Sequence, residues 1–235
     1  MQDEIIKHSK KIYSEMNNKN HSFKEKAKEV FAEILIIVFA VSLSIWLHSW
    51  SEERHEHKDA QTFLIGLKED LQNDISNLEE TKKKLDKTQQ QISFALHLTP
   101  KKIDSIKANH QQIQSGTNLI NTIVNNGRYE GFKSSGKINT IENQNVRNEI
   151  LSYYQQTIPQ IVHVEASYDK LTSKYVDLLL NGKEDEDINK TVLKQKTKII
   201  LSGINDFTKY NQKPYEDAIK QAREIIKEID KEENK

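Results

Sequence analysis

Residues 131–137 read GFKSSGK, and their spacing matches the GxxxxGK of a phosphate-binding loop. That chemistry needs a Ser or Thr hydroxyl at the next position to hold magnesium, and the next residue is Ile138. No apolar strand precedes the stretch, so no parallel sheet would position it. We therefore expect a glycine-containing turn between helices and no bound nucleotide.

A second stretch contains His48, Glu52, His55 and Glu56, which could share one side of a helix. Zinc needs three or four convergent ligands. These side chains directly follow an apolar segment, where long polar side chains that reach the membrane surface are expected. The acidic run 184–187 lacks the alternating ligands and central glycine of a calcium loop. We predict no metal and no cofactor.

Composition argues against several function classes. The 235 residues include no cysteine, which removes disulfides, thiolate nucleophiles and cysteine metal sites. The 35 basic and 35 acidic side chains balance, so no net positive field would attract nucleic acid. No nucleophile stands in a pattern with a base and an orienting partner. We expect a protein that is not an enzyme and binds no nucleic acid.

Residues 30–50 form an apolar segment that as a helix would be about 31 Å long, enough to cross a membrane. Trp46 and Trp50 lie at its far end, where indole rings prefer the interface, and His48 lies between them. Glu33 lies in the first turn, as an acid at the interface or as an intramembrane carboxylate for proton coupling or partner pairing. The segment predicts an uncleaved single-span anchor in contact with the lipid bilayer.

The distribution of basic residues predicts the orientation of this anchor. Residues 1–29 carry seven lysines, whereas a window of similar reach after the span holds only Arg54, Lys58 and Lys68. By the positive-inside rule, the N-terminus lies in the cytoplasm and residues 51–233 lie in the periplasm, across the cytoplasmic (inner) membrane. The tail 1–29 either forms an amphipathic helix on the inner leaflet or is disordered.

Beyond the span, apolar residues recur at helical spacing and predict an all-α fold. We expect one helix from the anchor to about residue 97, a second from Pro100 to Asn126, and a loop from 127 to 143. A third, long helix should pass Pro159 with a kink, and further helices should follow residue 189, with a restart at Pro214. Packed together they predict a single transmembrane helix that continues into an elongated antiparallel helical bundle.

Two groups of residues in the bundle are candidate sites. The heptad-spaced apolar residues of the first helix are a candidate face for oligomer formation. An aromatic group near the third helix is a candidate interaction or ligand patch, with plain core packing as the alternative. The oligomer face comprises Leu64, Leu71, Leu78, Leu85 and Ile92, and the patch comprises Tyr129, Phe132, Arg147, Tyr153 and Tyr154.

The order of features resembles a family of uncharacterised bacterial single-span membrane proteins, grouped as a domain of unknown function. In that family a basic tail precedes a segment of the form GEIxLVVxGIxxAxxxNxWNE. Residues 32–53 read AEILIIVFAVSLSIWLHSWSEE, which aligns Glu33, Ile34, Trp50 and Glu52, while Ala32 and His48 depart from the family's Gly and Asn. The family's downstream SSG … LrxxIxxYY stretch has counterparts in Ser134-Ser135-Gly136, Arg147, Ile150 and Tyr153-Tyr154. The resemblance covers most of the chain and implies an anchored helical domain without a known activity.

Three functions remain open at this point. The first is a non-enzymatic envelope protein whose external bundle binds another membrane or envelope protein, or itself. The second is a ligand-sensing bundle at the membrane surface, with the aromatic patch as its pocket. The third is an oligomeric membrane effector, for which Glu33 and the small residues Ala40 and Ser44 are the support.

Overall fold

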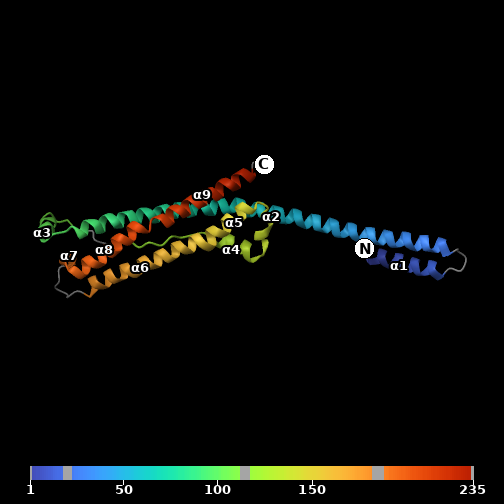
Figure 1. The fold of residues 1–235 in the computed structure, drawn as a ribbon, viewed down its shortest axis with the longest axis horizontal. Helices are drawn as coiled ribbons and strands as arrows, with labels where there is room; N and C mark the ends of the chain where they lie inside the picture. The colour runs from blue at the N-terminus through green and yellow to red at the C-terminus, as the bar shows by residue number, and fades with distance from the viewer. Residues whose placement is uncertain (1, 18–22, 112–116, 182–187, 234–235) are drawn as a thin grey trace. The chain divides into compact units, whose positions relative to one another are not determined.

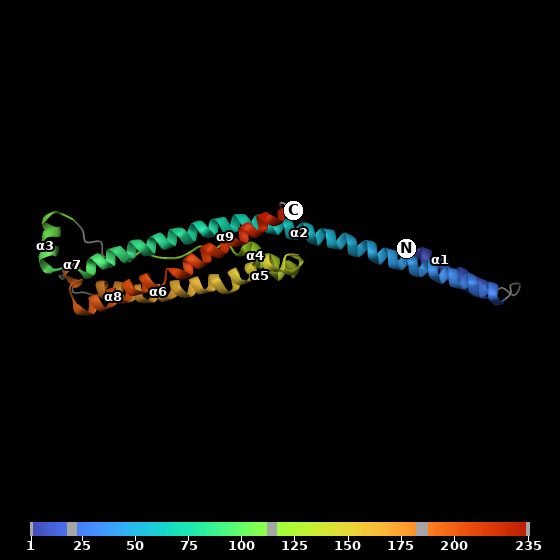
Figure 2. The ribbon, with the colours of Figure 1, turned by 45° about the horizontal axis from the view of Figure 1, so that its top comes forward.

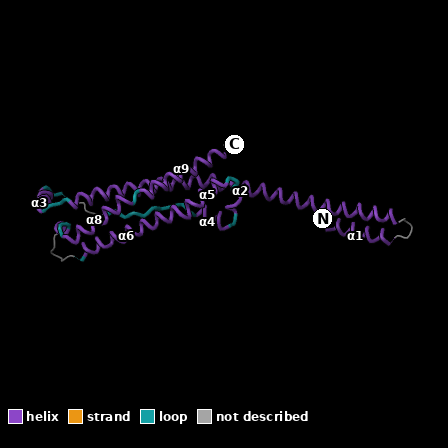
Figure 3. The backbone as a smooth tube through the Cα atoms, in the orientation of Figure 1, coloured by secondary structure: helices purple, strands orange, loops and turns teal. Residues whose placement is uncertain are grey.

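The computed structural model describes residues 2–17, 23–111, 117–181 and 188–233, and within them every regular element is helical (Figure 1, Figure 3). The predicted all-α fold class is confirmed. The chain divides into two compact units, residues 1–59 and 60–235. The acidic run 184–187 lies outside the described residues.

The first unit contains α1 (Gln2–Asn17) and the beginning of α2 (Phe23–Leu96), a helix of 74 residues. Near the N-terminus, α2 carries an apolar window of which only 6% is buried. Among the described residues it is the one helix long and apolar enough to cross a membrane. The structure therefore contains the apolar helix that the sequence predicts for a single-pass anchor.

The second unit is a bundle in which α2, an extended segment, α5–α6 and α8–α9 run lengthwise and alternate in direction (Figure 1, Figure 2). Short helices connect these passes at the two ends. After α2, the elements are α3 (Pro100–Ala108), α4 (Gly127–Ser134), the 3-10 helix η1 (Lys137–Thr140), α5 (Gln144–Ser152), the π-helix η2 (Tyr153–Thr157), α6 (Ile158–Leu180), α7 (Ile188–Thr191), α8 (Gln195–Tyr210) and α9 (Lys213–Glu233).

The bundle core follows two columns on α2 that alternate at steps of three and four residues. One column is wholly apolar and holds the five residues of the predicted oligomer face. The other begins and ends with apolar residues but has Asp74, Thr81 and Thr88 in its middle, all of them buried. We call these three residues the polar column.

The expected second helix is much shorter than predicted. It starts as the sequence predicts, because the Thr99 side chain accepts a hydrogen bond from the Lys102 amide. It ends at Ala108, His110 takes a left-handed φ of 53°, and residues 117–125 run extended along the bundle (Figure 3). An extended chain advances about 3.3 Å per residue against about 1.5 Å in a helix, so it returns along the bundle with fewer than half the residues.

Two further local predictions are adjusted by the structure. The expected loop from 127 to 143 contains α4 and η1, and Gly136 between them takes a φ of 77° that favours glycine. The third helix does continue past Pro159. One turn earlier, η2 widens the helix, and the Ile158 amide donates to the carbonyl of Tyr153, five residues back. This wider turn makes room for a ring that would clash with the preceding turn.

Candidate functional site

The predicted membrane-interface residues lie on α2 in the first unit. The side chains of Trp46 and Trp50 are exposed, and the Arg54 guanidinium lies 4.8 Å from the centre of the Trp50 ring. His48 Nε2 is 3.9 Å from a carboxylate oxygen of Glu52. Among the described residues, no group of three or more His, Asp and Glu side chains could hold a metal ion.

Glu33 differs from these neighbours because its side chain is buried. It accepts a hydrogen bond from Lys11 Nζ at 2.6 Å, and its other carboxylate oxygen contacts His8 Nδ1. Both partners belong to α1, so Glu33 joins the tail helix to the start of the apolar segment. The sequence left Glu33 as an acid at the interface or as an intramembrane carboxylate for proton coupling or partner pairing, and it did not identify α1 as the source of its contacts.

The predicted aromatic patch is largely assembled in the bundle. Tyr129 and Tyr154 stack with ring centres 4.4 Å apart, and Tyr153 meets Tyr154 edge to face at 4.9 Å. Phe132 stacks instead on Phe63 of α2, at 4.0 Å. The last patch member, Arg147, donates to the carbonyl of Asn139 at 3.3 Å. The tyrosine rings thus pack against one another, as core side chains do.

Asp74 of the polar column lies directly beside these tyrosines. Its carboxylate accepts from the Asn125 amide at 2.8 Å and from the Tyr153 hydroxyl at 3.4 Å. Burial raises the pKa of Asp74 from 3.8 to about 6, although both hydrogen bonds act in the opposite direction. Burial, together with the nearby Asp74 charge, also raises the pKa of Tyr153, so the phenol stays protonated.

Arg128 brings a positive charge close to this region. Its Nε donates to Asp70 at 2.8 Å across the surface of α2. The Arg128 side chain can lie over α2 here because residue 66 is a glycine. A Cβ at that position would lie 2.2 Å from the Arg128 guanidinium. A glycine in the middle of a long helix is the sequence signal for such a close approach.

The extended segment 117–125 binds along the polar column, an arrangement that sequence reasoning missed. The Asn118 amide group donates to the Thr88 hydroxyl at 2.8 Å, and the Thr122 hydroxyl lies 3.0 Å from that of Thr81. With Asn125 against Asp74, each residue of the polar column has one partner in the segment. The sequence feature that indicated this arrangement is the polar column: three polar residues spaced seven apart within an otherwise apolar stripe of α2.

From the other side, α6 contributes a second buried carboxylate. Glu165 accepts from the Thr122 amide at 3.0 Å and from its hydroxyl at 2.5 Å. The Tyr215 hydroxyl of α9 also donates to it, at 3.3 Å. Glu165 therefore joins α6, α9 and the extended segment.

The structure corrects the assignment of the oligomer face. Leu64, Leu71, Leu78, Leu85 and Ile92 are all buried in the core of the same chain. Because the chain's own helices and extended segment already cover this column, a second copy could reach it only if the bundle opened. Self-association must use another surface.

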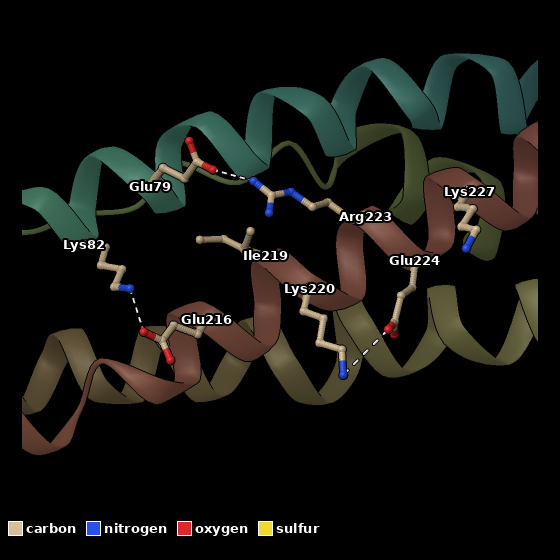
Figure 4. A pocket seen from close by; sticks show the side chains of 8 residues that line it. All are labelled: Glu79, Lys82, Glu216, Ile219, Lys220, Arg223, Glu224 and Lys227. Carbon is tan, nitrogen blue, oxygen red and sulfur yellow. Dashed lines mark hydrogen bonds and ion pairs between the residues drawn. The ribbon is translucent and has the colours of Figure 1, made fainter.

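A groove between α2 and α9 is a better candidate surface (Figure 4). It has a volume of about 490 Å³, and Ile219 contributes an apolar side chain to its lining. Two ion pairs connect its walls, Lys82 to Glu216 at 2.6 Å and Arg223 to Glu79 at 2.7 Å. The remaining lining residues are Lys220, Glu224 and Lys227 on α9. Charges of both signs thus line the groove beside Ile219, which is itself buried.

Comparisons with known proteins give one family and one distant relative. A family described as "Family of unknown function (DUF6090)" matches residues 33–201, from the start of the apolar segment into α8. The probable kinetochore protein NUF2 of Candida albicans is 25% identical over 207 residues, which are 86% of this chain and 39% of that protein. The chain therefore spans about two fifths of that relative's length. No solved structure matches the chain.

Proposed function

The chain belongs to the family of unknown function DUF6090, and we propose that it is a non-enzymatic envelope protein, anchored by one membrane span, whose helical bundle binds another protein. The α2–α9 groove carries the proposal. Its lining combines acidic and basic side chains of both helices with Ile219, which is only 8% exposed. A partner helix with exposed side chains of both charges would match it, because complementary charges orient a docking helix.

The membrane span supports the anchored part of the proposal. The apolar window of α2 leaves almost all its surface uncovered, which is costly in water and favourable in lipid. The lysine-rich tail favours an orientation with residues 1–29 in the cytoplasm and the bundle in the periplasm. The tyrosine cluster gives no comparable support to ligand sensing, since its rings stack on one another.

The groove is tested by photo-crosslinking in living cells. A photoreactive amino acid replaces Lys220 in the groove, and the control replaces Lys174, an exposed residue of α6 outside it. We expect a discrete crosslinked species from position 220 and none of that mass from position 174. Equal patterns from both positions, or no crosslinked species at all, would contradict the groove as a docking surface.

Orientation is tested separately, because the chain has no cysteine of its own. Ser14→Cys and Ser173→Cys each provide one exposed thiol, on α1 and α6 respectively. In spheroplasts, a membrane-impermeant maleimide should label the second variant directly and the first only after lysis. The reverse pattern would contradict the proposed topology.

A further inference from the structure

Four exposed side chains follow one another at steps of four residues where the apolar stretch of α2 ends. They are Trp46, Trp50, Arg54 and Lys58, and all belong to the first unit. Trp46 is 61% exposed and Trp50 is 48% exposed. Residues four apart are neighbours on a helix surface, so the four side chains form one continuous row. We call this row the tryptophan–basic ridge.

The acidic residues in this part of α2 lie mostly on another side of the helix. At about 100° per residue, Glu52, Glu56 and Asp59 project about 140° or more away from the middle of the ridge. Glu53 lies nearer, at about 100° from Arg54. The charges are therefore sorted around the helix, and the ridge is positive although acids outnumber basic residues here.

The Arg54 side chain is directed toward the apolar stretch. Its guanidinium lies 4.8 Å from the centre of the Trp50 ring, one turn nearer the N-terminus. Side chains on a helix lean in this direction because their Cα–Cβ bonds tilt toward the N-terminus. The uncharged apolar stretch 34–47 also lies on the N-terminal side. The basic groups of the ridge therefore lean toward the surface of the membrane that the proposed span crosses.

The position of Arg54 along α2 matches the headgroup layer of a bilayer. With the stretch 34–47 centred in the bilayer and the helix upright, the Arg54 Cα is about 20 Å from the bilayer centre. The hydrocarbon core extends to about 15 Å from the centre and the headgroups to about 20–22 Å. A guanidinium that folds back by one turn then lies among the phosphates, with the Trp50 ring at the edge of the hydrocarbon core.

We propose that the tryptophan–basic ridge binds the headgroup of an anionic phospholipid. The Arg54 guanidinium holds the phosphate, because two of its N–H groups can donate to two phosphate oxygens. Lys58 adds positive charge, and the Trp50 ring lies against the upper part of the acyl chains. An anionic headgroup neutralises the ridge, whereas a zwitterionic headgroup brings a cation that the ridge repels. Bilayer lipid is the occupant because the ridge continues directly from the apolar stretch.

This inference rests on the membrane span of the proposed function, and it names a lipid class that the span recognises. It depends neither on the orientation of the chain nor on the α2–α9 groove. Crosslinking from position 220 reports on the groove alone, so the ridge and the groove can fail independently.

The test uses the two tryptophans of the chain, both of which belong to the ridge. Full-length protein carrying Trp46→Phe is reconstituted into vesicles of phosphatidylcholine with a fixed share of phosphatidylglycerol, so that Trp50 alone reports. In one sample the phosphatidylglycerol has brominated acyl chains, and in the other an equal share of the phosphatidylcholine does. Bromine quenches a neighbouring indole, so the two samples show which lipid lies beside Trp50. We expect a few-fold preference for phosphatidylglycerol, since one basic side chain near an anionic surface corresponds to about fivefold in affinity.

Two matched variants locate the source of the preference. Arg54→Gln combined with Lys58→Gln removes both charges of the ridge and keeps good helix formers. Both brominated lipids should still quench Trp50 in this variant, but equally. Lys170→Gln combined with Lys174→Gln makes the same change in net charge at exposed positions of α6 and should keep the original preference.

Equal quenching by the two lipids before the charges are removed would overturn the headgroup site and leave the span intact. A preference that survives the loss of Arg54 and Lys58, or that disappears in the α6 control as well, would also overturn it, because the ridge would not be its source. Absence of quenching by either lipid would overturn the headgroup site together with the membrane span.

Discussion

The single helix α2 contains two apolar stretches that differ in what surrounds them. Between residues 34 and 47, large apolar side chains are exposed, with Phe39 at 68% and Ile45 at 63%. Between residues 64 and 92, Leu71, Leu78 and the other leucines of the same column are buried against the chain's own elements. The residue types are alike in the two stretches, so hydrophobicity alone does not determine which of them becomes protein core.

Arrangement around the helix makes the difference. In the second stretch apolar residues form one stripe, and polar residues cover the rest of the helix surface. Such a helix can bury its stripe in a bundle while its polar side faces water. In the first stretch apolar residues surround the helix, and the described elements, α1 included, leave nearly all of them exposed. A helix that is apolar all round needs either a large core or lipid, which is why lipid is the environment that fits.

The largest expected effect comes from charging the first stretch. Phe39→Asp combined with Val41→Asp places two carboxylates in the apolar segment, each at a cost of about 3 kcal/mol for insertion into a membrane. We expect the chain to leave the carbonate-washed membrane fraction. Fractionation followed by immunoblotting measures the shift.

The control places the same two charges on the bundle part of α2. Gln72→Asp combined with Asn73→Asp changes exposed positions and should leave the chain in the membrane fraction. If the variant with the charged apolar segment also stayed there, the segment would not be the anchor.

The next effect concerns the buried column. Leu78→Ala leaves a cavity in the bundle core and should lower the free energy of unfolding by about 2–5 kcal/mol. Leu47→Ala removes the same atoms from an exposed position in the apolar segment and should leave unfolding of the bundle unchanged. Denaturant unfolding in detergent, followed by circular dichroism, compares the two. Equal losses would contradict the contrast between the two stretches.

Much of this architecture was predictable because periodicity reports burial. The heptads of α2, the Thr99-Pro100 start and the Pro214 restart all rest on local spacing or local stereochemistry, and each matches an element boundary or a core column. The sequence also grouped the tyrosines: Tyr153 and Tyr154 are neighbours in η2, and Tyr129 of α4 stacks on Tyr154.

The remaining features could not be predicted, because they depend on contacts between residues that are far apart in the sequence. The stripe from Ile103 to Val124 has helical spacing, and what prevents a helix there is the set of hydrogen bonds that α2 and α6 offer to an extended backbone. Those partners lie about 30 to 50 residues away along the sequence. The oligomer face was misassigned for a related reason, since a heptad column does not say whether its partner belongs to the same chain or to another.

A smaller effect is expected from the titration of the buried carboxylate of Asp74. The pKa of Asp74 is about 6 in the fold against 3.8 as its usual value, so the folded state holds the proton more tightly. Stability should therefore be highest below about pH 4 and fall as pH rises to about 6, by up to about 3 kcal/mol from this group. Asp74→Asn should remove that slope, because its amide can still accept from Asn125 without a charge. Unfolding free energies from pH 4 to 7 measure it.

Asp169→Asn is the control for this titration, since it removes an exposed carboxylate of α6. Its pH profile should parallel that of the wild-type chain. If Asp74→Asn kept the wild-type pH dependence of the unfolding free energy, a group other than the Asp74 carboxylate would titrate in this range.

The smallest effect is expected on the solvated side of the same helix. Arg223→Glu places two acids opposite each other across the α2–α9 groove, where Arg223 and Glu79 are partly exposed. Water screens such pairs, so unfolding should be easier by only about 1 kcal/mol or less, and adding Glu79→Arg should restore most of the loss. A double-mutant cycle in denaturant measures the coupling. A loss as large as that of Leu78→Ala would mean that the groove wall belongs to the core, and a docking surface open to water would then have to be sought elsewhere on the bundle.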